Sequence, residues 1–138
     1  MPAAPRVSRG VRIAIIGAPR AGKTTLAQQF GREHGYMVWH ADDLIPLGWS
    51  QASDEVTNIL TSYQDLDFVF EGVAVVRALR KALLLRPDEA PVDRCIVLER
   101  PRLTLSPRQR AMARGCATVL ASIEPELVRR GVWMERPT

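Results

Sequence analysis

The residues best suited to chemistry by type and spacing lie near the N-terminus, in Gly17-Ala18-Pro19-Arg20-Ala21-Gly22-Lys23-Thr24-Thr25. This segment matches G-x-x-x-x-G-K-[ST] at every fixed position, the pattern of a phosphate-binding loop. Glycines at both ends of the loop permit backbone angles that turn successive N–H groups toward a phosphate. Lys23 can then reach the outer phosphates of a nucleotide, and the Thr24 hydroxyl can hold Mg²⁺. Residues 17–25 are therefore candidate nucleotide-binding residues.

The segments on both sides of this loop are those that a phosphate-binding loop requires. Residues 11–16 are almost all apolar, which is typical of a buried parallel strand. A helix is expected to begin near Lys23, with Leu26 and Phe30 four residues apart on its apolar face. Its N-terminus adds unpaired N–H groups and a positive dipole end. The order strand, loop, helix favours a phosphate site over an ordinary glycine turn.

Carboxylates stand at the ends of three further strand-like segments, 36–40, 67–72 and 94–99. In a parallel sheet these ends meet around the phosphate loop. Glu71 is predicted to hold Mg²⁺ or polarise a nucleophile, with capping of the next helix as the alternative. Asp42 and Asp43 could take a proton from an acceptor hydroxyl, and Asp42 could bind the metal; the alternative is an Asx turn. Glu99 is as well explained by a surface ion pair, and His40 is assigned no role.

Phosphoryl transfer also needs positive charge against the transferred group. Arg110 and Arg114 lie four residues apart and are expected to share one helix face. Arg77 and Arg108 are further candidates, and Arg20 lies within the loop itself. The alternative for each is an ordinary solvated arginine. We take Lys23, Asp42, Asp43, Glu71, Arg110 and Arg114 as the candidate catalytic residues, and Thr24, Glu71 and Asp42 as the candidate metal ligands.

Strand and helix patterns alternate along almost the whole chain, which predicts an α/β fold with helices on both faces of a mainly parallel, five-stranded sheet. Ser53 could cap a helix over 54–63, and Val76, Leu79 and Leu83 mark the buried face of the next. Ser106 followed by Pro107 is a strong helix start. A shorter turn through Pro125 and a strand over 132–134 are expected to end the fold. Residues 1–10 are interpreted as a flexible leader, and 11–138 as a single nucleotide-binding domain.

Composition restricts the partners and the compartment. The chain of 138 residues has a net charge of +4, and the charge comes almost entirely from arginines. These are spread along the sequence, so a nucleic-acid partner stays open but is not favoured. The sequence has no apolar run of membrane-spanning length and no secretory signal, which favours a cytoplasmic protein without a membrane partner. Cys95 and Cys116 lack metal-ligand spacing and are predicted to be buried.

Three segments together resemble the small P-loop kinases, the nucleotide, shikimate, gluconate and zeta-toxin-like group: residues 17–25, 40–44 and 70–72. The resemblance covers residues 11–134 and implies a P-loop NTPase fold, ATP and Mg²⁺ as cofactors, and an aspartate acting toward the acceptor hydroxyl. Segments 48–50 and 71–73 are also similar to small ATP-binding proteins of phages and prophages. These kinases usually close a lid after the fourth strand. Here only residues 101–105 are available. Either Arg108, Arg110 and Arg114 act from the following helix in place of the lid, or phosphoryl transfer is not the function of this protein.

Three functions follow from these residues. The first is a magnesium-dependent kinase that transfers phosphate from ATP to a small molecule or nucleotide. The second is an ATP hydrolase or a nucleotide-dependent switch that acts with nucleic acid or a protein partner. The resemblance to phage proteins includes a phage-encoded protein in this second class. The third is a nucleotide binder without turnover. ATP is favoured over GTP because the guanine-binding pattern N-K-x-D is absent. The acceptor is not identified by the sequence.

Overall fold

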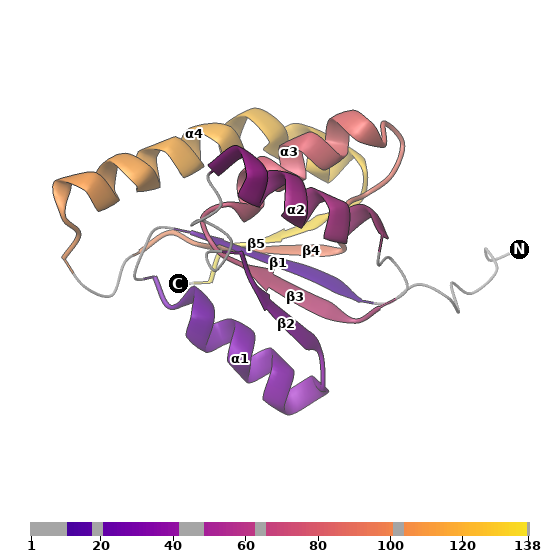
Figure 1. Ribbon diagram of the computed structural model, residues 1–138, viewed down its shortest axis with the longest axis horizontal. Helices are drawn as coiled ribbons and strands as arrows, with labels where there is room; N and C mark the ends of the chain where they lie inside the picture. The colour runs from indigo at the N-terminus through magenta and orange to yellow at the C-terminus, as the bar shows by residue number, and fades with distance from the viewer. Residues whose placement is uncertain (1–10, 18–20, 42–48, 63–65, 101–103, 138) are drawn as a thin grey trace, which may run out of the picture.

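Five parallel strands form one sheet through the middle of the protein (Figure 1). The computed structural model describes residues 11–17, 21–41, 49–62, 66–100 and 104–137. The strands stand in the order β2-β3-β1-β4-β5, with β1 at the centre. Every residue of β1 and β3 is buried, whereas the edge strands β2 and β5 are partly exposed. The strands are β1 (Arg12–Gly17), β2 (Met37–His40), β3 (Phe68–Glu71), β4 (Arg94–Leu98) and β5 (Trp133–Glu135).

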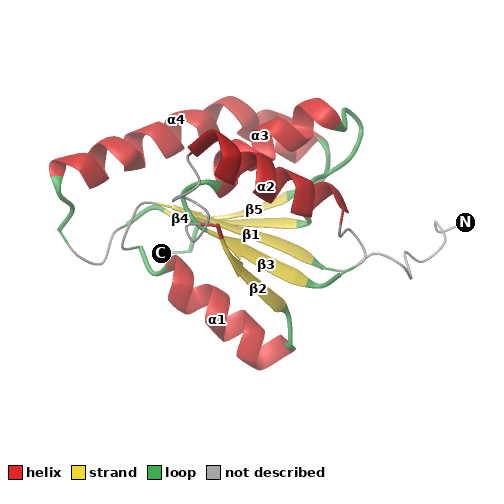
Figure 2. Cartoon of the chain, in the orientation of Figure 1, coloured by secondary structure: helices red, strands yellow, loops and turns green. Residues whose placement is uncertain are grey.

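Helices cover both faces of this sheet, which confirms the predicted three-layer α/β P-loop fold. They are α1 (Lys23–His34), α2 (Trp49–Ser62), α3 (Val75–Leu85) and α4 (Pro107–Arg129). Figure 2 shows α1 alone on one face, with α2, α3 and α4 on the other. Alternate side chains of β1 serve the two layers: Ile13 and Ile15 pack toward α1, and Ala14 and Ile16 toward the opposite core.

The second helix begins earlier than predicted. Ser53 was expected to cap a helix over 54–63, but α2 runs from Trp49 to Ser62, so Ser53 lies inside it. The helix therefore includes residues 49–53, which precede its predicted start. No glycine or proline occurs between Trp49 and Ser62, so nothing in this stretch stops the helix from propagating back to the residue after Gly48.

The last helix is longer than predicted, because α4 continues through Pro125 to Arg129. An internal proline removes one helix hydrogen bond and costs about 3 kcal/mol. Burial on both sides of Pro125 offsets this cost: Ile123 is 5% exposed and Leu127 is fully buried. Gly131 follows in the left-handed conformation, and β5 begins at Trp133, one residue later than predicted. The predicted helix start is confirmed, since Ser106 and Gln109 form a reciprocal capping box.

Both cysteines are buried, as predicted, and neither forms a disulfide bond. Burial raises the pKa of the Cys95 thiol to about 12, and the negative charge of Glu124 adds to the shift. Among the described helices, none is both long and apolar enough to cross a membrane.

Candidate functional site

The phosphate loop joins β1 to α1 at the carboxyl edge of the sheet, as its position in the sequence requires. Gly22 adopts a left-handed conformation with φ of 90°, and α1 starts at the next residue. No side chain of the described residues caps this helix, and its first turn contains no acidic residue. Its first N–H groups and its dipole therefore face the loop without a competing carboxylate, which suits an incoming anion. Ala18, Pro19 and Arg20 lie outside the described residues.

Glycine is needed at the other end of the loop for a different reason than predicted. Gly17 does not have a positive φ. It pairs with Leu98 of β4, and a Cβ added to Gly17 would lie 2.3 Å from the Leu98 carbonyl oxygen. The expectation that Gly17 supplies an unusual backbone angle is therefore wrong. A side chain is excluded here by the close approach of β4.

Lys23, the first residue of α1, is buried against the end of β1. Its Nζ donates a hydrogen bond to the Gly17 carbonyl oxygen at 3.1 Å, and the side chain is only 6% exposed. An ammonium group sheltered from water attracts an anion more strongly than one on the surface. Lys23 and the first N–H groups of α1 thus present positive charge to the same small volume.

Thr24, Glu71 and His40 form a hydrogen-bonded group beside the loop. The Thr24 hydroxyl donates to Glu71 Oε2 at 2.7 Å, and His40 Nδ1 lies 3.1 Å from the same oxygen. Glu71 is 1% exposed, although it comes at the end of β3. A buried carboxylate is costly unless hydrogen bonds and neighbouring dipoles satisfy it, and these two side chains serve that purpose.

The sequence reasoning left His40 without a role, and the sheet register explains why it lies here. His40 is the residue of β2 that pairs with Glu71 of β3, so both side chains leave the sheet at the same level. The available signal was that each is the last or nearly the last residue of its strand pattern. Only the pairing of β2 with β3, which local sequence does not specify, brings them into contact.

The oxygens of Thr24 and Glu71 suit Mg²⁺ in number and kind. Magnesium prefers hard oxygen ligands and is usually bound by one or two protein oxygens, with water and substrate phosphates completing the shell. Among the described residues, no group of three or more His, Cys, Asp or Glu side chains could hold a metal without such help. The donor set therefore fits a metal that arrives with a nucleotide. Asp42 and Asp43, predicted as proton acceptors or ligands, lie outside the described residues.

The remaining charged candidates occupy different places around this edge. Glu99 is 59% exposed and pairs with Arg136 at 2.7 Å, which is the surface ion pair considered as its alternative. Arg110 donates to the Leu105 carbonyl oxygen at 2.9 Å, so its guanidinium is bound to the chain before α4. The guanidinium of Arg77 lies beside Gly115 of α4. Arg114 lines a cavity next to the loop.

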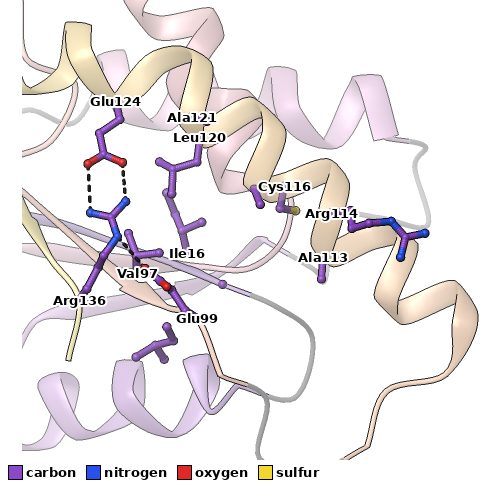
Figure 3. A pocket seen from close by; sticks show the side chains of 13 residues that line it. Ile16, Val97, Glu99, Ala113, Arg114, Cys116, Leu120, Ala121, Glu124 and Arg136 are labelled. Atoms are coloured by element: carbon purple, nitrogen blue, oxygen red, sulfur yellow. Dashed lines mark hydrogen bonds and ion pairs between the residues drawn. The ribbon is translucent and has the colours of Figure 1, made fainter. Parts of the chain in front are cut away.

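Two cavities flank the phosphate loop. One, of about 500 Å³, lies beside the start of α1 and is lined by Gly22, Leu26, Leu98, Arg100 and Pro137, among others. The other, of about 470 Å³, lies between α4 and the carboxyl ends of β1 and β4 (Figure 3). Both volumes lie within the range of small-molecule sites. The Arg136 side chain contributes to the walls of both cavities.

Solved structures of two kinases have a fold similar to this one. Shikimate kinase from Acinetobacter baumannii in complex with shikimate superposes with a TM-score of 0.54 at 18% identity, over 95% of this chain and 85% of that one. Thymidylate kinase from Candida albicans superposes with a TM-score of 0.53 at 16% identity, over 93% and 84% of the two chains. No protein-family model matches the sequence, and no curated protein matches it. At these identities the likeness establishes the fold: this chain has the three-layer α/β P-loop architecture of those kinases.

Proposed function

We propose that this protein binds ATP and transfers its γ-phosphoryl group to a small molecule or nucleotide. The observation that carries the proposal is the convergence of Lys23, Thr24 and Glu71 at one uncapped helix N-terminus. The phosphate group of a nucleotide is the ligand that best matches a buried ammonium group, the N–H groups of a helix N-terminus and a pair of hard oxygens.

The charge of the triphosphate is met mainly by the protein's own groups. Lys23 exchanges its hydrogen bond to the Gly17 carbonyl for bonds to the outer phosphate oxygens, while the N–H groups at the start of α1 hold the inner ones. The nucleoside part of ATP is proposed to bind in the cavity beside Gly22 and Leu26. Thr24 and Glu71 would hold Mg²⁺, which when bound neutralises charge on the phosphates.

In the transfer, an acceptor hydroxyl oxygen forms a bond to the γ-phosphorus as the bond to the bridging oxygen of ADP breaks. The hydroxyl proton passes to a carboxylate, for which Asp42 and Asp43 are the proposed bases. His40 keeps Glu71 directed at Thr24, since both side chains bond the same carboxylate oxygen. The groups around Glu71 thus hold the phosphate end of the reaction, and the aspartates act at the acceptor end.

Calorimetry with the only two lysines of the chain tests the nucleotide site. Lys23→Ala is expected to weaken ATP binding by about tenfold to a hundredfold, because hydrogen bonds to charged groups contribute about 1.5–3 kcal/mol. Lys81→Ala is the matched control, since Lys81 of α3 forms an ion pair with Asp54 of α2. Equal ATP affinity in the two variants would refute the phosphate-loop assignment.

An acceptor screen tests the transfer step. Wild-type protein with ATP and Mg²⁺ is expected to phosphorylate at least one member of a panel of nucleosides, nucleotides, sugars and hydroxy acids. Asp42→Asn and Asp43→Asn, made separately, identify the base: the variant that loses transfer while keeping its ATP affinity carries it. If both variants keep full transfer, neither aspartate is the base.

The second candidate function is ATP hydrolysis, alone or as a switch. It is favoured by the short connection between β4, which ends at Leu98, and α4, which begins at Pro107. A kinase normally excludes water by closing a longer segment over ATP. A hydrolase would release phosphate at the same rate with and without every acceptor of the panel, whereas a kinase would consume ATP faster with its own acceptor.

A further inference from the structure

Arg136 fastens the chain that follows β5 to two other elements. Glu135 is the last residue of β5 and also the last that pairs with β4. The next residue, Arg136, donates two hydrogen bonds to the carboxylate of Glu124 on α4, and its Nε lies 2.7 Å from Glu99 Oε1 (Figure 3). One guanidinium thus ties the end of the sheet's edge strand both to α4 and to the residue that follows β4.

The geometry of this cluster, formed by Glu99, Glu124 and Arg136, fixes the position of the guanidinium. Two parallel hydrogen bonds to one carboxylate orient the guanidinium plane, and the contact of Nε with a second carboxylate holds its other edge. Isolated ion pairs on a surface contribute little to stability, whereas a bidentate pair within a network is held in one geometry. All three side chains are partly exposed, so we expect the cluster to act by fixing positions more than by stabilising the core.

The same cluster forms part of the wall of the proposed nucleoside site. We call the cavity of about 500 Å³ beside the start of α1 the nucleoside cavity. Glu99, Arg136 and Pro137 line it, and Glu99 and Arg136 also line the cavity between α4 and the sheet. Glu124 is not among the described residues that line the nucleoside cavity, so its effect on a bound nucleoside has to pass through Arg136.

We infer that Arg136 is a positioning residue for the nucleoside of ATP, and that Glu124 and Glu99 fix its place. This inference rests on the proposed ATP-binding function and extends it to the part of ATP that the phosphate loop does not hold. A wall that is fixed before binding spares the complex the entropic cost of ordering that side chain and the chain beside it. Loss of the cluster therefore weakens binding of the nucleoside and leaves the contacts of Lys23 with the phosphates unchanged.

Calorimetric titrations with ATP and with inorganic tripolyphosphate test Arg136, because tripolyphosphate has no nucleoside. Both ligands are titrated into the full-length protein in the presence of Mg²⁺. Arg136→Ala is expected to weaken ATP binding about tenfold and to leave tripolyphosphate binding unchanged. Arg136→Lys keeps the charge but loses the fork, so it is expected to restore only part of the loss.

Glu124→Gln tests whether the effect passes through Arg136. It is expected to weaken ATP binding about threefold, because the charge-assisted pair is lost while Glu99 still holds Arg136. Glu135→Gln is the matched control: Glu135 pairs with Arg94 at 2.7 Å, and its side chain is 28% exposed, as is that of Glu124. Glu135 is not among the described residues that line either cavity, so this variant is expected to keep the ATP affinity of the wild type.

The two ligands also separate this inference from the proposed function. The inference is overturned if Arg136→Ala or Glu124→Gln keeps the ATP affinity of the wild type, or if binding of ATP and tripolyphosphate weakens equally. It is also overturned if Glu135→Gln weakens ATP binding as much as Glu124→Gln does. ATP binding that depends on Lys23 but not on Arg136 leaves the proposed function standing, whereas a wild-type protein that binds neither ligand overturns both.

Discussion

Replacing Gly17 with alanine tests how closely β1 and β4 are packed under the phosphate loop. The added Cβ would lie 2.3 Å from the Leu98 carbonyl oxygen and 3.1 Å from its carbonyl carbon. Both atoms belong to the backbone of a neighbouring strand, so no side-chain rotation relieves the contact. Val97, beside Leu98, is 5% exposed and packs in the core, which resists movement of β4.

The expected cost of Gly17→Ala is about 3 kcal/mol of unfolding free energy. Overpacking a well-filled site costs about 1–3 kcal/mol, and a clash between two backbone segments belongs at the upper end. The strain also displaces the Gly17 carbonyl that positions Lys23. We therefore expect ATP affinity to fall about tenfold, the effect of losing one hydrogen bond to a charged group.

Gly35→Ala is the matched control. Gly35 ends α1 with φ of 70°, but a Cβ there meets no atom within 4 Å. Its replacement costs only the strain of a left-handed alanine, about 1–2 kcal/mol, and leaves the phosphate loop untouched. Urea unfolding followed by tryptophan fluorescence measures both variants, and calorimetry measures their ATP affinity. The reasoning is refuted if Gly17→Ala destabilises the protein no more than Gly35→Ala does.

Three further predictions concern the helices and the core. Pro125→Ala should stabilise the protein by about 2 kcal/mol in urea unfolding, because it restores a hydrogen bond within α4. The greater conformational entropy of alanine in the unfolded chain offsets only part of this gain. A loss of stability would contradict the prediction. Hydrogen bonds from Arg129 and then Arg130 lower the pKa of Glu126 from its ordinary 4.5 to about 2. Its stabilising contribution is therefore complete above pH 4.5 and is lost as the pH falls toward 2, so the stability gap between wild type and Glu126→Gln should close over that range. Because the pKa of Cys95 is raised to about 12, a thiol-reactive dye should leave this residue unlabelled at pH 8 in folded protein and label it in urea; rapid labelling without denaturant would contradict its burial.

Local patterns in the sequence were enough to predict the architecture. The apolar run before Gly17, the phosphate-loop spacing and the Ser106-Pro107 helix start each depend on residues close together in the chain. Such features persist in the fold because they act through backbone angles, helix capping and alternating burial. The same reasoning placed Glu71 at the end of a strand, next to the loop.

What local patterns could not predict was decided by contacts between distant segments. The burial of Leu127 stabilises the continuation of α4 past Pro125, where the sequence alone predicted a separate, shorter turn. The parallel register of β2 with β3 brought His40 to Glu71, and the approach of β4 made Gly17 obligatory. The cavity between α4 and the sheet likewise exists because alanines on α4 face strands far away in the sequence. The sequence by itself therefore determined that a phosphate loop follows the first strand, whereas the packing of strands and helices determined which side chains and cavities surround it, because long-range register and packing are not encoded in any one segment.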